Sequence, residues 1–137
     1  MSVGCGDTEG VRVLVVDDEP GVVAVASSYF EHRSDRFDVV TETSARAALD
    51  RLEADGDEFD CVVSDFEMPE MDGLQFKDAV HEVQSDIPFI LFTTRERELF
   101  DGTRADEEVN YLQKGGLNGG FDELVDRVST VTGTEAT

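Results

Sequence analysis

The chain has 137 residues, 39% of them hydrophobic, and carries 32 Asp and Glu residues against 11 Lys and Arg. This length predicts one domain that buries roughly two-thirds of its unfolded surface. The formal charge of −21 argues against direct nucleic-acid binding, and no apolar run approaches the roughly 18 residues that span a membrane. The acids are spread along the whole chain. This distribution favours adaptation to high salt over an acidic surface that binds a basic partner. At 1 M salt the Debye length falls to about 3 Å, so the acids repel one another little.

The N-terminus and the two cysteines indicate a cytoplasmic setting. The first residues lack the basic start and apolar core of a secretion signal. Cys61 lies in an apolar run and Cys5 in a Gly-rich stretch, so we expect a buried thiol and no disulfide framework. Residues 1–10 and 131–137 are expected to be tails on one domain that covers 11–130.

Short apolar runs alternate with segments of helical periodicity along the chain. Pro20 suits the first turn of a helix, and Ser44 suits the N-cap of the next one. Strands that alternate with helices predict an α/β fold, with a mostly parallel sheet covered on both faces. In chain order the expected elements are strand 11–16, helix 20–34, strand 37–43, helix 45–54, strand 59–65, helix 72–83, strand 87–94, a weakly patterned helix 95–108, strand 109–114 and helix 121–131.

Polar side chains stand at the carboxyl ends of the expected strands. Asp17 and Asp18 follow the first strand, and Asp65 ends the third. Thr93 lies at the end of the fourth, and Lys114 ends the fifth. Ligands bind at the carboxyl ends of the strands in such sheets, so these groups are expected to meet at one edge. Taken singly, Asp65 and Asp17 could each do no more than cap the following helix.

Three neighbouring carboxylates repel one another, and a hard cation such as Mg²⁺ would compensate for that repulsion. The strand ends hold no His or Cys, which disfavours zinc, and His32 and His81 are expected on the surface of helices. A metal held by oxygens beside a lysine and a threonine suits phosphoryl transfer. No GxxxxGK[ST] loop is present, which leaves a carboxylate nucleophile that forms an aspartyl-phosphate as the remaining option.

Four stretches, "VLVVDDEP", "VVSDFEMPEMDG", "ILFTT" and "YLQKG", carry a family resemblance. In their order and spacing, over about residues 11–130, the chain resembles the receiver domains of two-component response regulators. The resemblance implies a flavodoxin-like (βα)5 fold, a three-layer sandwich whose parallel five-stranded sheet has the order 2-1-3-4-5. The pair Lys114-Gly115, together with the acidic composition, resembles receivers of haloarchaeal regulators.

By this resemblance Asp65 is the phosphoacceptor, and Asp17 and Asp18 are the acidic pair that organises Mg²⁺. Asp65 belongs to the same metal site, and the backbone carbonyl of Glu67 falls where the family supplies another ligand.

The remaining matches concern the phosphoryl group and the switch. Thr93 and Lys114 match the residues that contact the phosphoryl group, and Tyr111 matches the aromatic whose rotamer follows Thr93. Pro69 and Gly73 match the loop that shapes the site around the acceptor.

The resemblance implies a self-modifying switch and no enzyme with a separate substrate. A sensor histidine kinase or a phosphotransfer protein would donate the phosphoryl group to Asp65. The face built by the fourth helix with the fifth strand and helix would then bind a downstream protein or form a phosphorylation-dependent homodimer. Whether the chain acts alone or within a longer regulator stays open.

Two other functions remain open at this point. Gly115 stands where the family usually has proline, which favours a phosphorylation-inactive interaction module. Glu67 has the spacing of the general acid in Mg²⁺-dependent phosphatases that use an aspartyl-phosphate, although the sequence shows no cap domain. We also hypothesise that Glu67 and Arg95 pair across the site entrance and restrict the water that hydrolyses the phosphate.

Overall fold

A computed structural model describes residues 11–33, 37–55, 59–84, 87–93, 110–113 and 120–132 of the chain. The segment 95–108, where a helix is expected, lies outside these residues. The described elements are β1 (Val11–Val16), α2 (Pro20–Arg33), β2 (Phe37–Glu42), α3 (Ala45–Asp55), β3 (Cys61–Ser64), α4 (Gly73–Val83), β4 (Phe89–Thr93), β5 (Asn110–Gln113) and α5 (Phe121–Thr132).

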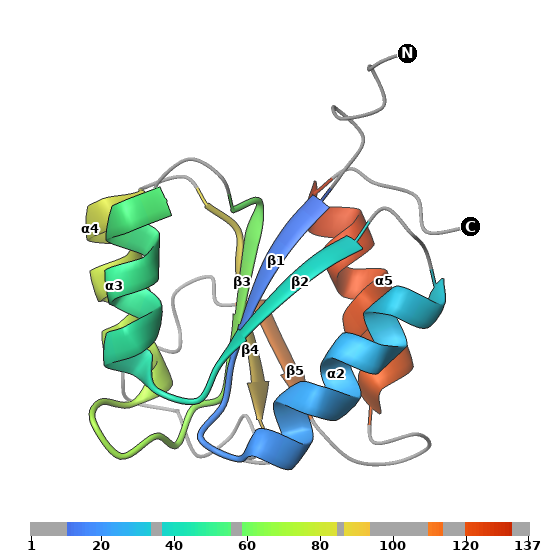
Figure 1. The fold of residues 1–137 in the computed structure, drawn as a ribbon, viewed down its shortest axis with the longest axis horizontal. Helices are drawn as coiled ribbons and strands as arrows, with labels where there is room; N and C mark the ends of the chain where they lie inside the picture. The colour runs from blue at the N-terminus through green and yellow to red at the C-terminus, as the bar shows by residue number, and fades with distance from the viewer. Residues whose placement is uncertain are drawn as a thin grey trace.

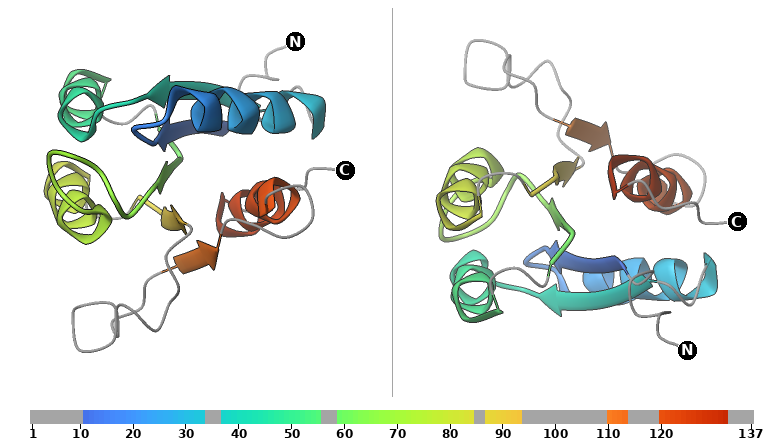
Figure 2. Two further views of the ribbon diagram at one scale, coloured as in Figure 1. Left: turned by 90° about the horizontal axis from the view of Figure 1, so that it is seen from below. Right: turned by 90° about the horizontal axis from the view of Figure 1, so that it is seen from above.

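The strands form one parallel sheet, in which the order is β2-β1-β3-β4-β5. Helices α3 and α4 cover one face of this sheet, and α2 and α5 cover the other (Figures 1 and 2). The expected α/β fold with a parallel sheet is therefore confirmed. Within the described residues, no helix combines the length and the apolar character needed to cross a membrane.

The sheet separates two hydrophobic cores. Along β1, Val13 and Val15 pack into the core under α2 and α5, whereas Leu14 and Val16 pack into the core under α3 and α4. Successive side chains of a strand point to opposite faces, so a strand covered on both sides needs a continuous apolar run. This requirement explains the apolar run from Val13 to Val16, whereas Arg12, near the start of the strand, is half-buried and pairs with Asp38 at 3.6 Å.

Two strands begin later than the sequence predicted. The chain bends at Asp60, whose carboxylate accepts a hydrogen bond from the amide of Arg12 at 2.9 Å, and β3 begins only at Cys61. β4 begins at Phe89 because Pro88 has no amide hydrogen to contribute to a strand ladder.

The histidines differ from each other in their surroundings. His32 is exposed, as expected. His81 was expected on the surface and is instead half-buried. Its Nε2 lies 3.0 Å from the carbonyl oxygen of Ile87, and its ring meets Phe89 edge-on with centroids 6.3 Å apart. The expectation failed because Ile87 and Phe89, which follow α4 in the chain, lie against its last turn.

Candidate functional site

The register of β1 and β3 places two of the expected acids side by side. Val16 pairs with Ser64, and each is followed directly by an aspartate, Asp17 or Asp65. The amide of Asp65 donates to the carbonyl oxygen of Val16 at 3.0 Å, which continues the ladder by one bond. On the other side of β1, the amide of Asp17 donates to the carbonyl oxygen of Glu42 at 3.2 Å. Main-chain bonds therefore hold both acids at the carboxyl edge of the sheet.

Three carboxylates converge at this edge. One oxygen each from Asp17, Asp18 and Asp65 can be chosen so that all three lie within 4.8 Å of one another. Asp17 is 2% exposed, Asp65 is half-buried and Asp18 is exposed, so the group opens to solvent on one side. An all-oxygen donor set of this kind suits Mg²⁺ or Ca²⁺ and does not suit zinc. The juxtaposition of these three acids that the sequence predicted is present.

Asp65 does not cap the next helix. That task belongs to Asp72, whose carboxylate accepts from the amide of Gln75 at 2.8 Å, while the Gln75 side chain accepts from the amide of Asp72 at 2.9 Å. This is a capping box, and it satisfies the first amides of α4. The Asp65 carboxylate instead accepts from the adjacent amide of Phe66 at 2.8 Å.

Asp17 stabilises the turn that leads into α2. Its carboxylate accepts from the amide of Glu19 at 3.0 Å, immediately before the helix begins at Pro20. Asp17 therefore does not cap α2, because its bond goes to the residue before the helix and not to an amide of the first turn. The same side chain also belongs to the acidic cluster.

The loop after Asp65 is anchored from inside the protein. Phe66, Met68 and Met71 pack against the core under α3 and α4. The amide of Gly73 donates to the carbonyl oxygen of Phe66 at 2.7 Å, so the loop closes where α4 begins. A side chain at Gly73 would collide with the loop, since an added Cβ would lie 2.7 Å from the carbonyl oxygen of Asp65.

The other expected site residues are placed less completely. Thr93 is buried at the last position of β4, where it pairs with Gln113 of β5. β5 ends at Gln113, one residue before Lys114. Lys114, Arg95 and Gly115 lie outside the described residues.

Tyr111 and Glu67 lie in β5 and in the loop after Asp65. The backbone of Tyr111 lies in β5 opposite Leu91, but its side chain falls outside the description. Glu67 is exposed on the acceptor loop, and its pairing with Arg95 stays a prediction.

Sequence reasoning missed Glu70, which lies in the acceptor loop and bonds to the start of α3. Its carboxylate accepts from the hydroxyl of Ser44 at 2.9 Å and from the amide of Arg46 at 3.1 Å. Ser44 was recognised as an N-cap, and the amide of Ala47 does donate to its hydroxyl at 3.2 Å. The partner of that cap could not be inferred, because it is 26 residues away in the sequence.

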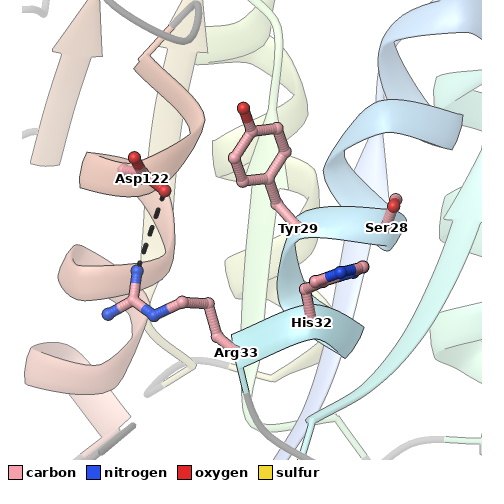
Figure 3. A pocket seen from close by; sticks show the side chains of 5 residues that line it. All are labelled: Ser28, Tyr29, His32, Arg33 and Asp122. Atoms are coloured by element: carbon pink, nitrogen blue, oxygen red, sulfur yellow. Dashed lines mark ion pairs between the residues drawn. The ribbon is translucent and has the colours of Figure 1, made fainter.

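A separate pocket of about 400 Å³ lies between α2 and α5 (Figure 3). Ser28, Tyr29, His32 and Arg33 line it from α2, and Asp122 lines it from α5. Arg33 pairs with Asp122 at 4.0 Å and with Asp126 at 2.6 Å, which ties the two helices together. None of these residues belongs to the acidic cluster.

Comparisons with known proteins find relatives of this chain by sequence and by fold. Over 116 residues, 85% of this chain and 17% of the relative, the sequence is 31% identical to the two-component response regulator ARR12 of Arabidopsis thaliana. The crystal structure of a response regulator receiver domain protein from Clostridium thermocellum superposes with a TM-score of 0.77 at 18% identity, over 90% of this chain and 94% of that chain.

The response regulator TrrA of Thermotoga maritima, in complex with Mg²⁺ and BeF, superposes with a TM-score of 0.72 at 24% identity, over 88% of this chain and 98% of that chain. The chain spans between 15% and 36% of the length of the curated relatives it matches. Residues 13–116 match the response regulator receiver domain family. The fold and the three acids at the strand ends agree with that match. The chain therefore belongs to the response regulator receiver domain family of two-component signalling.

Proposed function

We propose that Asp65 accepts a phosphoryl group from a phosphohistidine of a sensor kinase or phosphotransfer protein. The convergence of Asp17, Asp18 and Asp65 at the carboxyl edge of the sheet is the observation that carries this proposal. Asp65 is half-buried and Asp18 exposed, so a donor approaches from the solvent side of the cluster.

The donor set fits Mg²⁺. Asp17, Asp18 and Asp65 offer carboxylate oxygens, and the backbone carbonyl of Glu67 is proposed as a further ligand. TrrA, which shares this fold, forms a complex with Mg²⁺ and BeF, and this gives general support for Mg²⁺ binding. When bound, Mg²⁺ supplies positive charge that offsets the repulsion between an incoming phosphoryl group and the carboxylates.

The chemical step belongs to Asp65. One carboxylate oxygen attacks the phosphorus, the bond between phosphorus and the leaving atom of the donor breaks, and the electron pair departs with that atom. The leaving group is the imidazole of the donor histidine, or acetate when acetyl phosphate is the donor. Thr93 and Lys114 are proposed to contact the phosphoryl oxygens, the first as a hydrogen-bond donor and the second as a cation.

We propose further that the receiver domain covers residues 11–130 and completes a (βα)5 fold, which requires a helix between β4 and β5. Tyr111 is proposed to follow Thr93 when the domain switches. The face formed by that helix, β5 and α5 would then bind a downstream protein or a second copy of the chain. The protein would act as a switch that modifies itself and would turn over no separate substrate.

Intact mass spectrometry after incubation with acetyl phosphate and Mg²⁺ in molar salt tests the proposal. We expect one phosphate on the wild type and none on Asp65→Asn, because the amide cannot act as the nucleophile. Omission of Mg²⁺ should also suppress the adduct. No adduct on folded wild-type protein would overturn the proposal in favour of an inactive interaction module.

A further inference from the structure

Glu70 joins two parts of the site that are distant in the sequence. It lies in the loop 65–72, which begins with the proposed phosphoacceptor and ends at the N-cap of α4. Its carboxylate bonds to the first turn of α3, through the Ser44 hydroxyl at 2.9 and 3.0 Å and the Arg46 amide at 3.1 Å. The inner side of this loop is anchored by apolar packing, and Glu70 supplies a polar anchor on the outer side.

The start of α3 needs an acid that its own sequence does not provide. No acid lies in the first turn of α3, and the residue three positions after the Ser44 cap is Ala47, where a capping box would have Glu or Gln. The first turn instead contains Arg46, a cation at the positive end of the helix dipole. Glu70 supplies the missing negative charge from another segment. The Arg46 amide and then the Ser44 hydroxyl lower the pKa of Glu70, which favours its ionised form.

The same short segment also reaches the other side of the acidic cluster. Glu42, two residues before Ser44, accepts the amide hydrogen of Asp17 through its backbone carbonyl. Its side chain pairs with Arg51 of α3 at 2.6 Å. Residues 42–46 therefore contact the segment that carries Asp17 at one point and the loop that follows Asp65 at another.

We propose that Glu70 is a positioning residue of the phosphoacceptor site. By bonding to the start of α3, it holds the loop that carries Asp65 and Glu67 in register with the segment that carries Asp17. This inference rests on the proposed function and deepens it. Glu70 itself touches neither the metal nor the phosphoryl group and acts through the loop.

The test compares Glu70→Ala and Glu70→Gln with a charge-matched control, Glu53→Ala. Glu53 is an exposed acid two turns further along α3, so its removal changes the net charge equally without altering the loop anchor. Two quantities are measured in molar KCl on the whole chain. The first is the Mg²⁺ dissociation constant without any phosphodonor, obtained by calorimetry, and the second is the labelling rate at saturating Mg²⁺ and varied acetyl phosphate.

We expect Glu70→Ala to weaken Mg²⁺ binding and to lower the maximal labelling rate by about tenfold, as for other residues that orient a metal ligand. The acetyl phosphate concentration for half-maximal rate should change little. Glu70→Gln keeps an oxygen acceptor of the same shape, so it should retain most of the wild-type behaviour. Glu53→Ala should match the wild type in both measurements.

Two results would overturn the inference. One is a Glu70→Ala variant within twofold of the wild type in both quantities, and the other is an equal loss in Glu53→Ala, which would indicate a general charge effect. The Mg²⁺ measurement separates this inference from the proposed function. If the wild type binds Mg²⁺ but takes no phosphate, the proposed function fails, while the affinities of the variants still decide the role of Glu70.

Discussion

Gly73, the first residue of α4, lies against the acceptor loop, and Gly73→Ala tests how tightly that loop is packed. The glycine is buried, and an added Cβ would lie 2.5 Å from a methyl carbon of Leu91, 2.7 Å from the carbonyl oxygen of Asp65 and 2.9 Å from the Cα of Phe66. Two of these three atoms belong to the backbone and cannot move aside by a simple rotation. The loop or the helix must shift.

The expected cost follows from that overlap. Inserting a methyl group into a packed region costs about 1–3 kcal/mol, and the contacts with backbone atoms at 2.7 and 2.9 Å place Gly73→Ala in the upper half of that range. Subtracting about 1 kcal/mol for the better helix propensity of alanine leaves about 1–2 kcal/mol. An unfolding entropy of about 2.1 cal/mol/K per residue amounts to about 0.3 kcal/mol/K for this chain length. The Tm of Gly73→Ala should therefore fall by about 3–7 °C.

Gly21→Ala is the matched control for this substitution. Gly21 lies in the first turn of α2, and an added Cβ there would meet nothing within 4 Å. Alanine at such a site restricts the unfolded chain and favours the helix by about 0.4–1 kcal/mol. The Tm of this variant, followed by circular dichroism in the same salt, should equal or exceed that of the wild type.

The labelling assay adds a second measurement on the same variant. Because the Asp65 carbonyl is one of the atoms in contact, Gly73→Ala should also slow labelling by acetyl phosphate. A Gly73→Ala protein that melts at or above the wild-type temperature and labels at the wild-type rate would refute the packing argument.

Two further predictions concern ionisable groups. The pKa of Glu70 is lowered in the folded protein from an ordinary value of 4.5, so its contribution to stability is present above about pH 4.5 and is lost as the pH falls below that value. The Tm difference between the wild type and Glu70→Gln should therefore be largest near neutral pH and shrink towards pH 3, and a difference independent of pH would contradict this. The pKa of the Cys61 thiol is raised, mainly by burial and to a smaller extent by the neighbouring charge of Asp60. In a Cys5→Ser background the native protein should resist a thiol reagent at about pH 8 and react fully in urea, whereas rapid native labelling would show that the sheet opens.

Much of the fold was predictable because the three central strands, β1, β3 and β4, are buried almost throughout. β1 was predicted residue for residue, since its apolar run has no other reasonable interpretation in a chain of this composition. The starts of β3 and β4 were predicted too early. The chain bends at Asp60, and Pro88 has no amide hydrogen for a strand ladder. Both effects concern the backbone, and the hydrophobic pattern gives no sign of them.

The acidic cluster was predictable for a related reason. Asp17, Asp18 and Asp65 each follow a recognisable strand, and parallel strands bring their carboxyl ends together. The contact of Glu70 with Ser44 was not predictable, since it depends on how two loops meet across the edge of the sheet. The surroundings of His81 were missed likewise, because the segment that covers it comes after the helix and does not belong to its periodic pattern.

The amides of Asp17 and Asp65 are bonded to main-chain carbonyls, and this has a consequence for how the protein can diverge. The identity of an exposed side chain hardly affects such bonds, so many surface residues can be substituted while Asp17 and Asp65 keep their positions. The net charge of −21 is compatible with such bonds. A designer who wished to move this domain into a different solvent could exchange exposed acids of its helices other than Asp126, which pairs with Arg33, and leave every strand and the loop that carries Glu70 as they are.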